Sequence, residues 1–565
     1  MLTREINDAL LASYSEDIPT FLKNIYAARG VLESQLSLSL NGLLKPDFEQ
    51  INIALDLLEK ALFTQKRILI IGDFDCDGAT ASVVAVKSLR MMGGKYVDFL
   101  VPNRFEHGYG LSEEIVMLAI QEKQPDLIIT VDNGISSFEG VKLAKSSGIK
   151  VIITDHHLPS KEVPEADAII NPNTKDCKFL SKNLAGVGVC FYLMSALKTH
   201  LLNQDYFTKH NIPNPDLRTV LDLVALGTVA DVVKLDQNNR ILVNEGIKRI
   251  RQKLCSVGIL ALLEIANRPA ELLQASDLGF AVGPRLNAAG RLDDISFGIQ
   301  CLLTSDMNDA RRYASRLEAF NKDRKITQER IQDEAQAIVE SQTIEQEQFA
   351  ISVYDKSWHE GVVGIVAGKL KETYHCPSAV FAKSDATFIK GSIRSIADVH
   401  IKDLLDLVDR ENPELIEKFG GHAMAAGLTI KEENFERFKS EFSKGIQAHL
   451  NNKLPKLELL TDGKLQAYDL TLANAQLITD NGPWGQGFEE PVFYGEFELI
   501  EQRVVGEKHL KCTLKLIGDS IMHDAIAFFQ APIDVNQVLV AYKLSVNTWR
   551  GNSNLQLMIS KIKAL

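Results

Sequence analysis

The sequence has few of the features that mark secreted or membrane-bound proteins. Only seven cysteines occur among 565 residues, and none forms a C-x-x-C pair, so they predict reduced, buried thiols rather than disulfides. No apolar run approaches membrane-spanning length, and no low-complexity tract occurs. Residues 1–8 lack the apolar core of a signal peptide. These absences predict a cytoplasmic protein with no membrane contact. The length of 565 residues is enough for three or four domains.

The chain also lacks the excess positive charge expected of a DNA-binding protein. It has 62 Lys and Arg against 74 Asp and Glu, a formal net charge of −12. This balance does not exclude nucleic acid, because phosphate contacts need only a local basic track and bound cations would offset acidic residues. Residues 311–330 and 240–253 are candidate tracks. An ion-paired, solvated helix face explains either stretch about equally well.

Four clusters of acidic residues and histidines each follow an apolar run. They are Asp73, Asp75 and Asp77; Asp132; Asp155, His156 and His157; and Asp231. The runs before the first three clusters, 67–72, 127–131 and 151–154, are rich in Ile, Leu and Val and predict parallel strands buried on both faces. Open α/β sheets bind ligands at the carboxyl ends of their strands, so the clusters are expected to meet in one crevice.

This concentration of carboxylates predicts a metal site. Asp73, Asp75 and Asp77, brought close to Asp132 and Asp231, would repel one another unless cations or protons compensated their charge. Carboxylates with imidazoles and no thiolate favour Mn²⁺ or Mg²⁺ over structural zinc. A carboxylate that bridges two ions would give the arrangement that activates water for in-line phosphoryl displacement, and Asp132 is the candidate bridge. Each cluster alone fits an Asx turn, a helix N-cap or a core histidine. Their conjunction favours the metal.

The four clusters, in this order, resemble the motifs of the DHH phosphoesterase superfamily. Segments 283–291, 357–367 and 420–427 make the resemblance closer to the RecJ single-stranded-DNA-specific exonucleases, from about Arg67 to the C-terminus. The resemblance implies an enzyme that degrades single-stranded DNA 5′→3′ to mononucleotides with metal-activated water, in DNA recombination and repair. It implies two ions of Mn²⁺ or Mg²⁺ as cofactors, and a DNA helicase and single-stranded-DNA-binding protein as partners.

The resemblance also implies individual roles in the metal site. The metal ligands would be Asp75, Asp77, Asp132, His156 and Asp231, with Asp73 at the edge of the site. His157 would face the scissile phosphate, and Asp155 would orient a neighbouring group from outside the ligand set. Some superfamily members carry a histidine where this chain has Ile71, so the occupancy of a second metal position stays open.

Phosphate-binding residues are expected in the second half of the chain. Arginines hold oxyanions in fork geometry, and glycine-rich backbone can approach a phosphate closely. The resemblance places Ser392, Arg394 and the 420–422 segment in a substrate-binding domain. A loop with Arg104 and Tyr109 could hold a phosphate and stack a base, although a packed loop is nearly as good an explanation. The candidate set is Arg104, Tyr109, Arg285, Asn287, Arg291, His359, Ser392, Arg394, Gly420, Gly421 and His422.

The fold class predicted from these patterns is α/β with a C-terminal OB-fold β-barrel. Five parts are expected along the chain. They are a peripheral N-terminal helical segment (1–45), a doubly wound parallel-sheet DHH metal domain (46–236), a helical connector (237–345), a smaller α/β DHH-associated domain (346–450) and the barrel (451–565). The later part of the connector, from about Asp309 to Gln342, has a helical period and predicts a long bridging helix.

Two other functions remain open. The same site could serve a DHH phosphoesterase acting on short oligoribonucleotides or cyclic dinucleotides, although the connector and the barrel favour a longer polymer. A catalytically silent scaffold that binds DNA or replication proteins is the second alternative. Such a scaffold would have no chemical reason to keep every candidate ligand. Preferred substrate length and metal-dependent cleavage separate the three functions.

Overall fold

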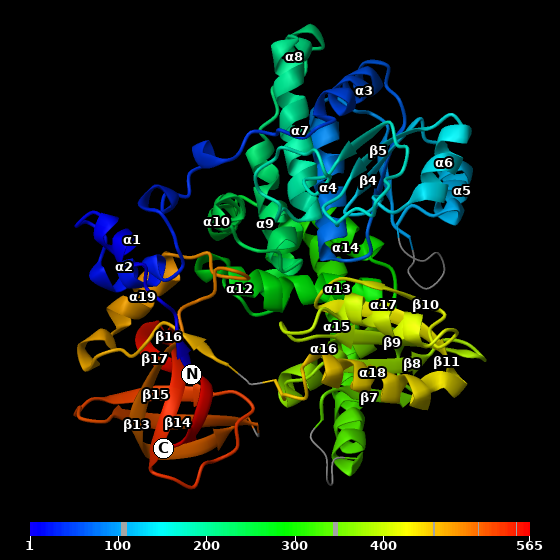
Figure 1. The fold of residues 1–565 in the computed structure, drawn as a ribbon. Helices are drawn as coiled ribbons and strands as arrows, with labels where there is room; N and C mark the ends of the chain where they lie inside the picture. The colour runs from blue at the N-terminus through cyan, green and yellow to red at the C-terminus, as the bar shows by residue number, and fades with distance from the viewer. Residues whose placement is uncertain (103–109, 343–347, 456–457, 507, 550) are drawn as a thin grey trace. The chain divides into compact units, whose positions relative to one another are not determined.

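The computed structural model describes residues 1–102, 110–342, 348–455, 458–506, 508–549 and 551–565 (Figure 1). The chain divides into two compact units. The first comprises Met1–Gly290, Asp294–Leu317 and Leu459–Leu565, and the second comprises Arg291–Asp293 and Glu318–Glu458. Among the described residues, no helix combines the length and the apolar character needed to cross a membrane.

A five-stranded, wholly parallel sheet lies at the centre of the first unit. Its strands are β2 (Ile68–Gly72), β3 (Val97–Leu100), β4 (Leu127–Val131), β5 (Lys150–Thr154) and β6 (Ala168–Ile170), in the order β3-β2-β4-β5-β6. Every residue of β2 and β4 is buried, as the Ile- and Leu-rich runs predict. The chain order reverses between β2 and β4, and a doubly wound sheet has its ligand crevice at such a switch point.

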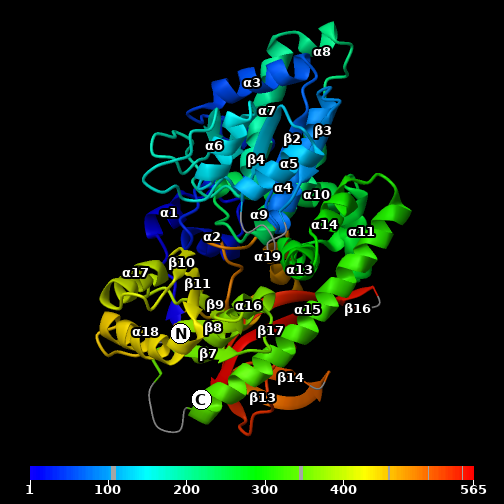
Figure 2. The same cartoon turned by 90° about the vertical axis from the view of Figure 1, so that its right-hand side faces the viewer.

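Helices cover both faces of this sheet, which confirms the doubly wound prediction (Figures 1 and 2). Helices α5 (Glu113–Glu122) and α6 (Phe138–Ser146) lie on one face, where Ile115 and Val141 join a core with Leu69 and Ile128. Helices α4 (Cys76–Met91), α7 (Gly186–Asn203) and α9 (Leu221–Ala230) lie on the other side. Most of their residues are buried, so these helices form a second packed layer.

The rest of the first unit is helical up to the barrel. These helices are α3 (Ile51–Phe63), α8 (Tyr206–Lys209), α10 (Gln237–Arg251), α11 (Val257–Ile265), α12 (Ala275–Asp277), α13 (Gly283–Leu292) and α14 (Ser296–Leu303). The long helix expected from about Asp309 is α15, which runs from Met307 to Gln342 without a glycine or proline. A π-helical turn, Leu278–Val282, precedes α13.

The N-terminal segment is helical, as expected, but it is not peripheral. It contains α1 (Asp8–Ser13) and α2 (Thr20–Ala27). Strand β1 (Leu2–Thr3) pairs in parallel with β12 (Leu460–Thr461), which lies at the start of the C-terminal part of the unit. Arg29 reinforces this pairing with a bidentate ion pair to Asp462, at 2.5 and 3.1 Å. A two-residue strand has no sequence period, so the pattern could not predict this connection.

The C-terminal part of the first unit is a closed five-stranded barrel, as the sequence predicts. Its strands are β13 (Phe493–Val505), β14 (His509–Leu516), β15 (Met522–Ala527), β16 (Gln537–Trp549) and β17 (Asn552–Ala564), in the order β13-β14-β15-β17-β16. The pairs are antiparallel except β15 with β17. The first residues of β13 alternate between buried and half-buried, and Phe497 points into the core with Tyr542. Helix α19 (Leu472–Asp480) precedes the barrel.

The second unit is a mixed five-stranded sheet with helices on both sides. Its strands are β7 (Ile351–Asp355), β8 (Ser378–Lys383), β9 (Phe388–Arg394), β10 (Lys418–Gly421) and β11 (Ala425–Lys431), in the order β10-β11-β9-β8-β7. Helix α16 (Glu360–Tyr374) and the later part of α15 share one core with β7 and β8. Helices α17 (Ile401–Glu411) and α18 (Phe435–His449) form the other core, so this part is the smaller α/β fold that the sequence predicts.

Candidate metal centre

The first acidic cluster forms the turn from β2 into α4. Asp75 is the N-cap of α4, and its carboxylate accepts hydrogen bonds from the backbone N–H groups of Asp77 (2.9 Å) and Gly78 (3.0 Å). Asp73 lies between the strand end and this cap. A Cβ at Gly78 would lie 2.5 Å from the Asp73 backbone nitrogen, so only glycine allows so tight a turn. The turn therefore holds three carboxylates at one helix N-terminus, where the helix dipole favours negative charge.

Asp77 is buried and held by a second helix N-terminus. Its carboxylate oxygens accept hydrogen bonds from the backbone N–H groups of Gly186 (2.6 Å) and Val187 (2.9 Å), which begin α7. These donors lie 109 and 110 residues further along the chain. The sequence did not identify them, because backbone donors carry no side-chain signal. Their effect is to fix the direction of the Asp77 carboxylate.

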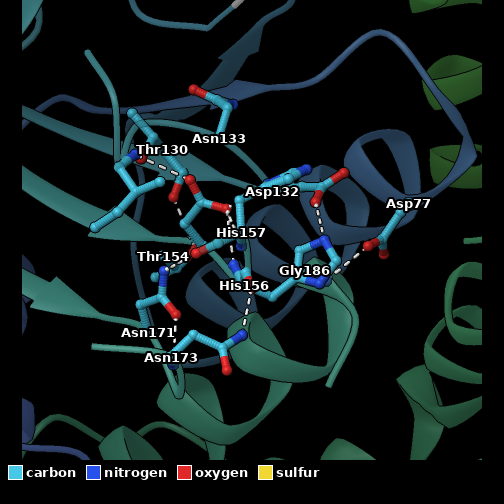
Figure 3. Close-up of polar contacts among 12 residues, drawn as sticks. Asp77, Thr130, Asp132, Asn133, Thr154, His156, His157, Asn171, Asn173 and Gly186 are labelled. Carbon is cyan, nitrogen blue, oxygen red and sulfur yellow. Dashed lines mark hydrogen bonds and ion pairs between the residues drawn. The ribbon is translucent and has the colours of Figure 1, made fainter. Parts of the chain in front are cut away.

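Asp132 follows β4 with a left-handed backbone, at φ 63°. Asn133 stabilises this turn, since its side-chain amide donates to the carbonyls of Ile71 (3.0 Å) and Val131 (2.9 Å). Nε2 of His156, after β5, lies 3.2 Å from Oδ1 of Asp132 (Figure 3). The same nitrogen lies 3.5 Å from Oδ2 of Asp231. The carboxyl ends of β4 and β5 thus bring an imidazole between two carboxylates.

Asp231 reaches the centre from the end of a helix, unlike the first three clusters, which follow strands. The apolar run 226–230 belongs to α9, and the Asp231 N–H continues this helix by donating to the carbonyl of Gly227 (2.9 Å). Val232 then turns the chain with φ 60°, a strained value for a β-branched residue. A Cβ at Gly227 would lie 2.9 Å from Oδ1 of Asp77, so glycine permits the close approach of α9 to α4.

Asp155 organises the loop that carries both histidines. Its Oδ1 accepts hydrogen bonds from the backbone N–H groups of His156 (2.7 Å) and His157 (3.0 Å), and lies 2.7 Å from Nδ1 of His157. Its Oδ2 accepts from the backbone N–H of Ile135 (2.9 Å). Burial alone would raise the pKa of Asp155, but these hydrogen bonds, led by the one from His157, lower it below its ordinary value. Asp155 is therefore an ionised, fully engaged buried carboxylate.

The pKa values of four other carboxylates of this centre shift in the opposite direction. Burial, and then the charges of neighbouring aspartates, raise the pKa values of Asp73, Asp132 and Asp231 well above the ordinary value. The same causes, partly offset by the N–H groups of Gly186 and Val187, raise the pKa of Asp77 to about 7. These four acids are too crowded to be ionised together at neutral pH without a compensating cation.

The donor set fits Mn²⁺ or Mg²⁺. Three groups of side chains place one ligand atom each within 4.8 Å of the others: Asp132 with His156 and His157, Asp77 with His156 and Asp231, and Asp73 with Asp75 and Asp132. Oδ1 of Asp73 is buried and accepts no hydrogen bond from the part of the chain that the structure describes. The set contains carboxylate oxygens and imidazoles but no thiolate, which favours these ions over structural zinc.

Two candidate substrate-binding residues of the first unit, Arg285 and Asn287, lie in α13. Oδ1 of Asn287 accepts a hydrogen bond from the backbone N–H of Cys76 at 2.7 Å, which joins α13 to the start of α4. Arg285 is buried, and its guanidinium donates to the carbonyl of Ala281 at 2.6 Å. Arg104 and Tyr109 lie outside the described residues.

The candidates of the second unit gather around the first two turns of α16. Nη1 of Arg394 donates to Oγ of Ser392 at 3.0 Å, and a Cβ at Gly364 would lie 2.9 Å from that oxygen. Gly427 pairs with Ser392 on one side and with Gly420 on the other. Arg291 donates to the carbonyl of Gly361 (3.0 Å) and His359 caps α16 by accepting from the Gly361 N–H (3.1 Å).

The remaining candidates lie in the turn between β10 and β11. Gly421 ends β10 with φ 155°, and the His422 N–H donates to the carbonyl of Ala425 at 2.8 Å. Within the second unit, the predicted residues therefore fall on neighbouring strands and on the helix that packs against them.

The two candidate basic tracks are largely occupied by contacts within the chain. In 311–330, ion pairs join Arg311 to Glu264, Arg312 to Asp309 and Arg330 to Glu334, each at 3.0 Å. These pairs match the solvated-helix explanation. In 240–253, Lys248 pairs with Glu245 and Lys253 with Glu271. Arg240 is only 3% exposed, so the solvated-helix explanation does not hold for this residue.

Gly186→Ala is expected to weaken Mn²⁺ binding about tenfold and to slow metal-dependent hydrolysis accordingly. A Cβ there would lie 2.5 Å from Cβ of Asp132, and such overpacking costs about 1–3 kcal/mol. The backbone N–H that holds Asp77 would remain. Titration calorimetry with Mn²⁺ measures the effect. Gly188→Ala is the matched control, because its nearest neighbour is a flexible Leu184 methyl at 3.1 Å; equal Mn²⁺ affinity in both variants would contradict the expectation.

Three family models match successive stretches of the chain. The DHH family, N-terminal domain, matches residues 67–228, the DHHA1 domain matches 346–448 and the RecJ OB domain matches 461–561. Together they cover the parallel sheet with every candidate metal ligand except Asp231, the mixed sheet and most of the barrel.

Curated relatives match nearly the whole chain. The single-stranded-DNA-specific exonuclease RecJ of Salmonella typhimurium is 48% identical over 563 residues, 98% of this chain and 97% of the relative. That of Escherichia coli is 47% identical and covers 99% and 98%. Among solved structures, RecJ in complex with Mn²⁺ from Thermus thermophilus matches with a TM-score of 0.80 at 28% identity, over 99% of this chain and 77% of that one. The Mg²⁺ complex from the same organism gives 0.74.

Proposed function

The chain belongs to the RecJ family of single-stranded-DNA-specific exonucleases, and we propose that it degrades its substrate from the 5′ end and releases mononucleotides. It is a metal-dependent exonuclease. The observation that carries the chemistry is the crowding of buried carboxylates at the β2–β4 switch point, where the raised pKa values of four aspartates call for cations. Hydrolysis of a phosphodiester needs activated water and positive charge on the phosphate oxygens, and cations held there meet both needs.

The ions would be held by Asp75, Asp77, Asp132, His156 and Asp231, with Asp73 at the edge of the set. Asp132 belongs to two of the groups whose ligand atoms lie within 4.8 Å, which supports it as the bridge between two ions. When bound, Mn²⁺ or Mg²⁺ supplies a more acidic water and neutralises charge on the phosphate. After burial, mutual repulsion is the cause that raises the pKa values of Asp77, Asp132 and Asp231, and a bound cation would offset that repulsion.

His157 would act on the scissile phosphate, and Asp155 would position it. The pKa of Asp155 is lowered, so its ionised carboxylate only accepts hydrogen bonds. The proton of this pair therefore lies on Nδ1 of His157, 2.7 Å from Asp155. Burial alone would lower the pKa of His157, but its contacts with Asp155 outweigh burial and raise the pKa above the ordinary value. In the imidazolium form Nε2 also carries a proton, which it would donate to a non-bridging phosphate oxygen to stabilise the charge that develops there.

The remaining candidates would hold the phosphates next to the scissile bond. Arg394 and Ser392 are already joined by a hydrogen bond, so they form a preorganised fork with a hydroxyl at its side. Arg291, His359, Gly420, Gly421 and His422 would complete this group, with Arg285 and Asn287 beside the first acidic cluster and Arg104 and Tyr109 in the segment before α5. Binding of neighbouring phosphates would orient the scissile one for in-line attack.

The cellular setting is part of the same proposal. A DNA helicase would supply the single strand, single-stranded-DNA-binding protein would accompany it, and the work would be recombination and repair in the cytoplasm. The five-stranded barrel supports a polymeric substrate, because OB-folds bind single strands along a groove on one face of the barrel. We also propose domain limits of 46–236 for the metal domain, 237–345 for the connector, 346–450 for the DHH-associated domain and 451–565 for the barrel.

A single-stranded DNA oligonucleotide labelled at either end tests this function. With Mn²⁺ or Mg²⁺, the 5′ label is expected to appear at once as a mononucleotide, while the 3′ label remains on shortening strands. Chelator should stop both. Shortening from the labelled 3′ end would keep the metal centre but overturn the polarity.

The same reaction separates the alternatives. Preference for di- or trinucleotides of RNA, or for cyclic dinucleotides, over a long single strand of DNA would favour the second DHH activity. Binding of the long strand without cleavage under either ion would favour the silent scaffold.

A further inference from the structure

A polar cavity of about 380 Å³ lies within the first unit, formed by three segments that are distant in sequence. One face of α10 contributes Arg240, Asn244 and Lys248, which are spaced four residues apart. The segment after α2 contributes Ser37 and Ser39, and the end of α19 contributes Asn481. The walls thus consist mainly of hydrogen-bond donors, with two cations among them.

Arg240 in this cavity is one end of a four-layer stack. Its guanidinium lies 3.9 Å from the ring centre of Phe488. The Phe488 ring stacks on Trp484 with centroids 4.8 Å apart and planes 7° from parallel. At the other end, the guanidinium of Arg29 lies 5.6 Å from the Trp484 ring. Two guanidinium groups therefore enclose two aromatic rings, an arrangement that holds each guanidinium by its flat face.

The two arginines differ in what their N–H groups contact. Arg29 makes a bidentate ion pair with Asp462 and donates to the carbonyl of Glu489. Arg240 is only 3% exposed, yet no acid or carbonyl of the described residues accepts a hydrogen bond from it, and its Nε is buried without a partner. A buried guanidinium without a hydrogen bond is costly. Phe488 covers its flat face, and Arg240 is one of the residues that line the cavity.

The acids that line the cavity do not serve Arg240. Glu245 pairs with Lys248 at 2.8 Å, and Asp480 accepts a hydrogen bond from Gln476 at 2.9 Å. A ligand that satisfies Arg240 must therefore bring its own negative charge. The hydroxyls of Ser37 and Ser39 suit an anion with several oxygens. The amides of Asn244 and Asn481 each donate one N–H to a backbone carbonyl of the chain and keep a second N–H. A phosphate ester has this chemistry and occurs in both the substrate and the product of the proposed reaction.

We propose that this cavity binds a phosphate group of the DNA, either a backbone phosphate of the single strand or the phosphate of a released nucleotide. The inference rests on the proposed function for the source of the phosphate. A phosphate bound there would contact three segments of the chain. One of them, α10, follows the loop that begins after the candidate metal ligand Asp231. Leu235 in that loop also donates to the carbonyl of Gln486, next to the aromatic stack.

Arg240→Met and Arg29→Met are the matched variants. Each variant removes one end of the same stack. Only Arg240→Met should change phosphate binding. The protein is kept in chelator, and its affinity for a 20-residue thymidine oligonucleotide is measured over a range of salt concentrations. Separately, the thermal shift caused by thymidine monophosphate and by inorganic phosphate is recorded.

A backbone site predicts that Arg240→Met binds the oligonucleotide at least about threefold more weakly. Its salt slope should fall by about 0.7, the value for one phosphate of a single strand, while Arg29→Met keeps the wild-type slope. A nucleotide site predicts instead that the thermal shift by thymidine monophosphate is lost in Arg240→Met alone. Equal behaviour of the two variants in both measurements would overturn the proposal and leave the stack purely structural. Because no metal is present, failure of wild-type hydrolysis would count against the proposed function and not against this site.

Discussion

Asp132→Asn is expected to reduce hydrolysis of single-stranded DNA by about a thousandfold or more, because a neutral amide replaces the carboxylate best placed to bridge two ions. That loss corresponds to about 4 kcal/mol of transition-state stabilisation. The metal-free variant should nevertheless melt at a higher temperature than the wild type. Burial and the charges of Asp77 and Asp75 raise the pKa of Asp132 well above its ordinary value, so its ionised form destabilises the fold.

The sign of this stability difference depends on pH and on metal. The penalty is fully present above the raised pKa of the folded state, and it declines as the pH falls from that value toward the ordinary pKa of an unfolded aspartate, below which it is absent. The difference in melting temperature between the metal-free proteins should therefore shrink at low pH. With Mn²⁺ the order should reverse, because the ion stabilises only a protein that binds it.

Asp126→Asn is the matched control. Asp126 precedes β4 and Asp132 follows it, so the two aspartates stand at opposite ends of one strand. Asp126 pairs with Lys66 at 3.0 Å and accepts from the Arg67 N–H at 2.9 Å, in a partly exposed position. Its replacement should leave hydrolysis and the Mn²⁺-induced shift unchanged. Hydrolysis by Asp132→Asn within tenfold of the wild-type rate would contradict the role of Asp132.

The strands of the parallel sheet were predictable, because a strand buried on both faces has an unbroken run of apolar residues. The runs of Ile, Leu and Val before Asp73, Asp132 and Asp155 match β2, β4 and β5 closely. The alternation in β13 identified the barrel in the same way. The long α15 was predictable because nothing in its sequence breaks a helix. Each of these elements follows from a local period that persists over several residues.

The contacts that direct the site were not predictable from such periods. The donors to Asp77 are backbone N–H groups of Gly186 and Val187, which any sequence offers. Asp231 comes from the end of α9. The sequence did not reveal this, because an apolar run of five residues does not distinguish a strand from a buried helix. The cavity at Arg240 depends on aromatic rings about 250 residues later in the sequence. The sequence could therefore predict candidate site residues but not the interactions that place them.

Asp155→Asn is expected to lower the rate of hydrolysis by about a hundredfold and the affinity for Mn²⁺ by about tenfold, a typical range for a partner of metal-binding histidines. Asp155 accepts four hydrogen bonds, from Ile135, from the backbone of both histidines and from Nδ1 of His157. An amide has only one acceptor oxygen, so its NH₂ group would face at least one of these donors. The loop that carries His156 and His157 must then shift.

Comparison with His157→Ala separates positioning from a general loss of structure. If Asp155 acts by directing His157, the double variant should be about as slow as His157→Ala alone, because a misdirected imidazole and a missing one are equivalent. Mn²⁺ affinity should behave differently, since Asp155 also holds the backbone of His156. It should fall in Asp155→Asn and in the double variant but stay near the wild-type value in His157→Ala. Additive losses of rate would show that Asp155 acts on the reaction independently of His157.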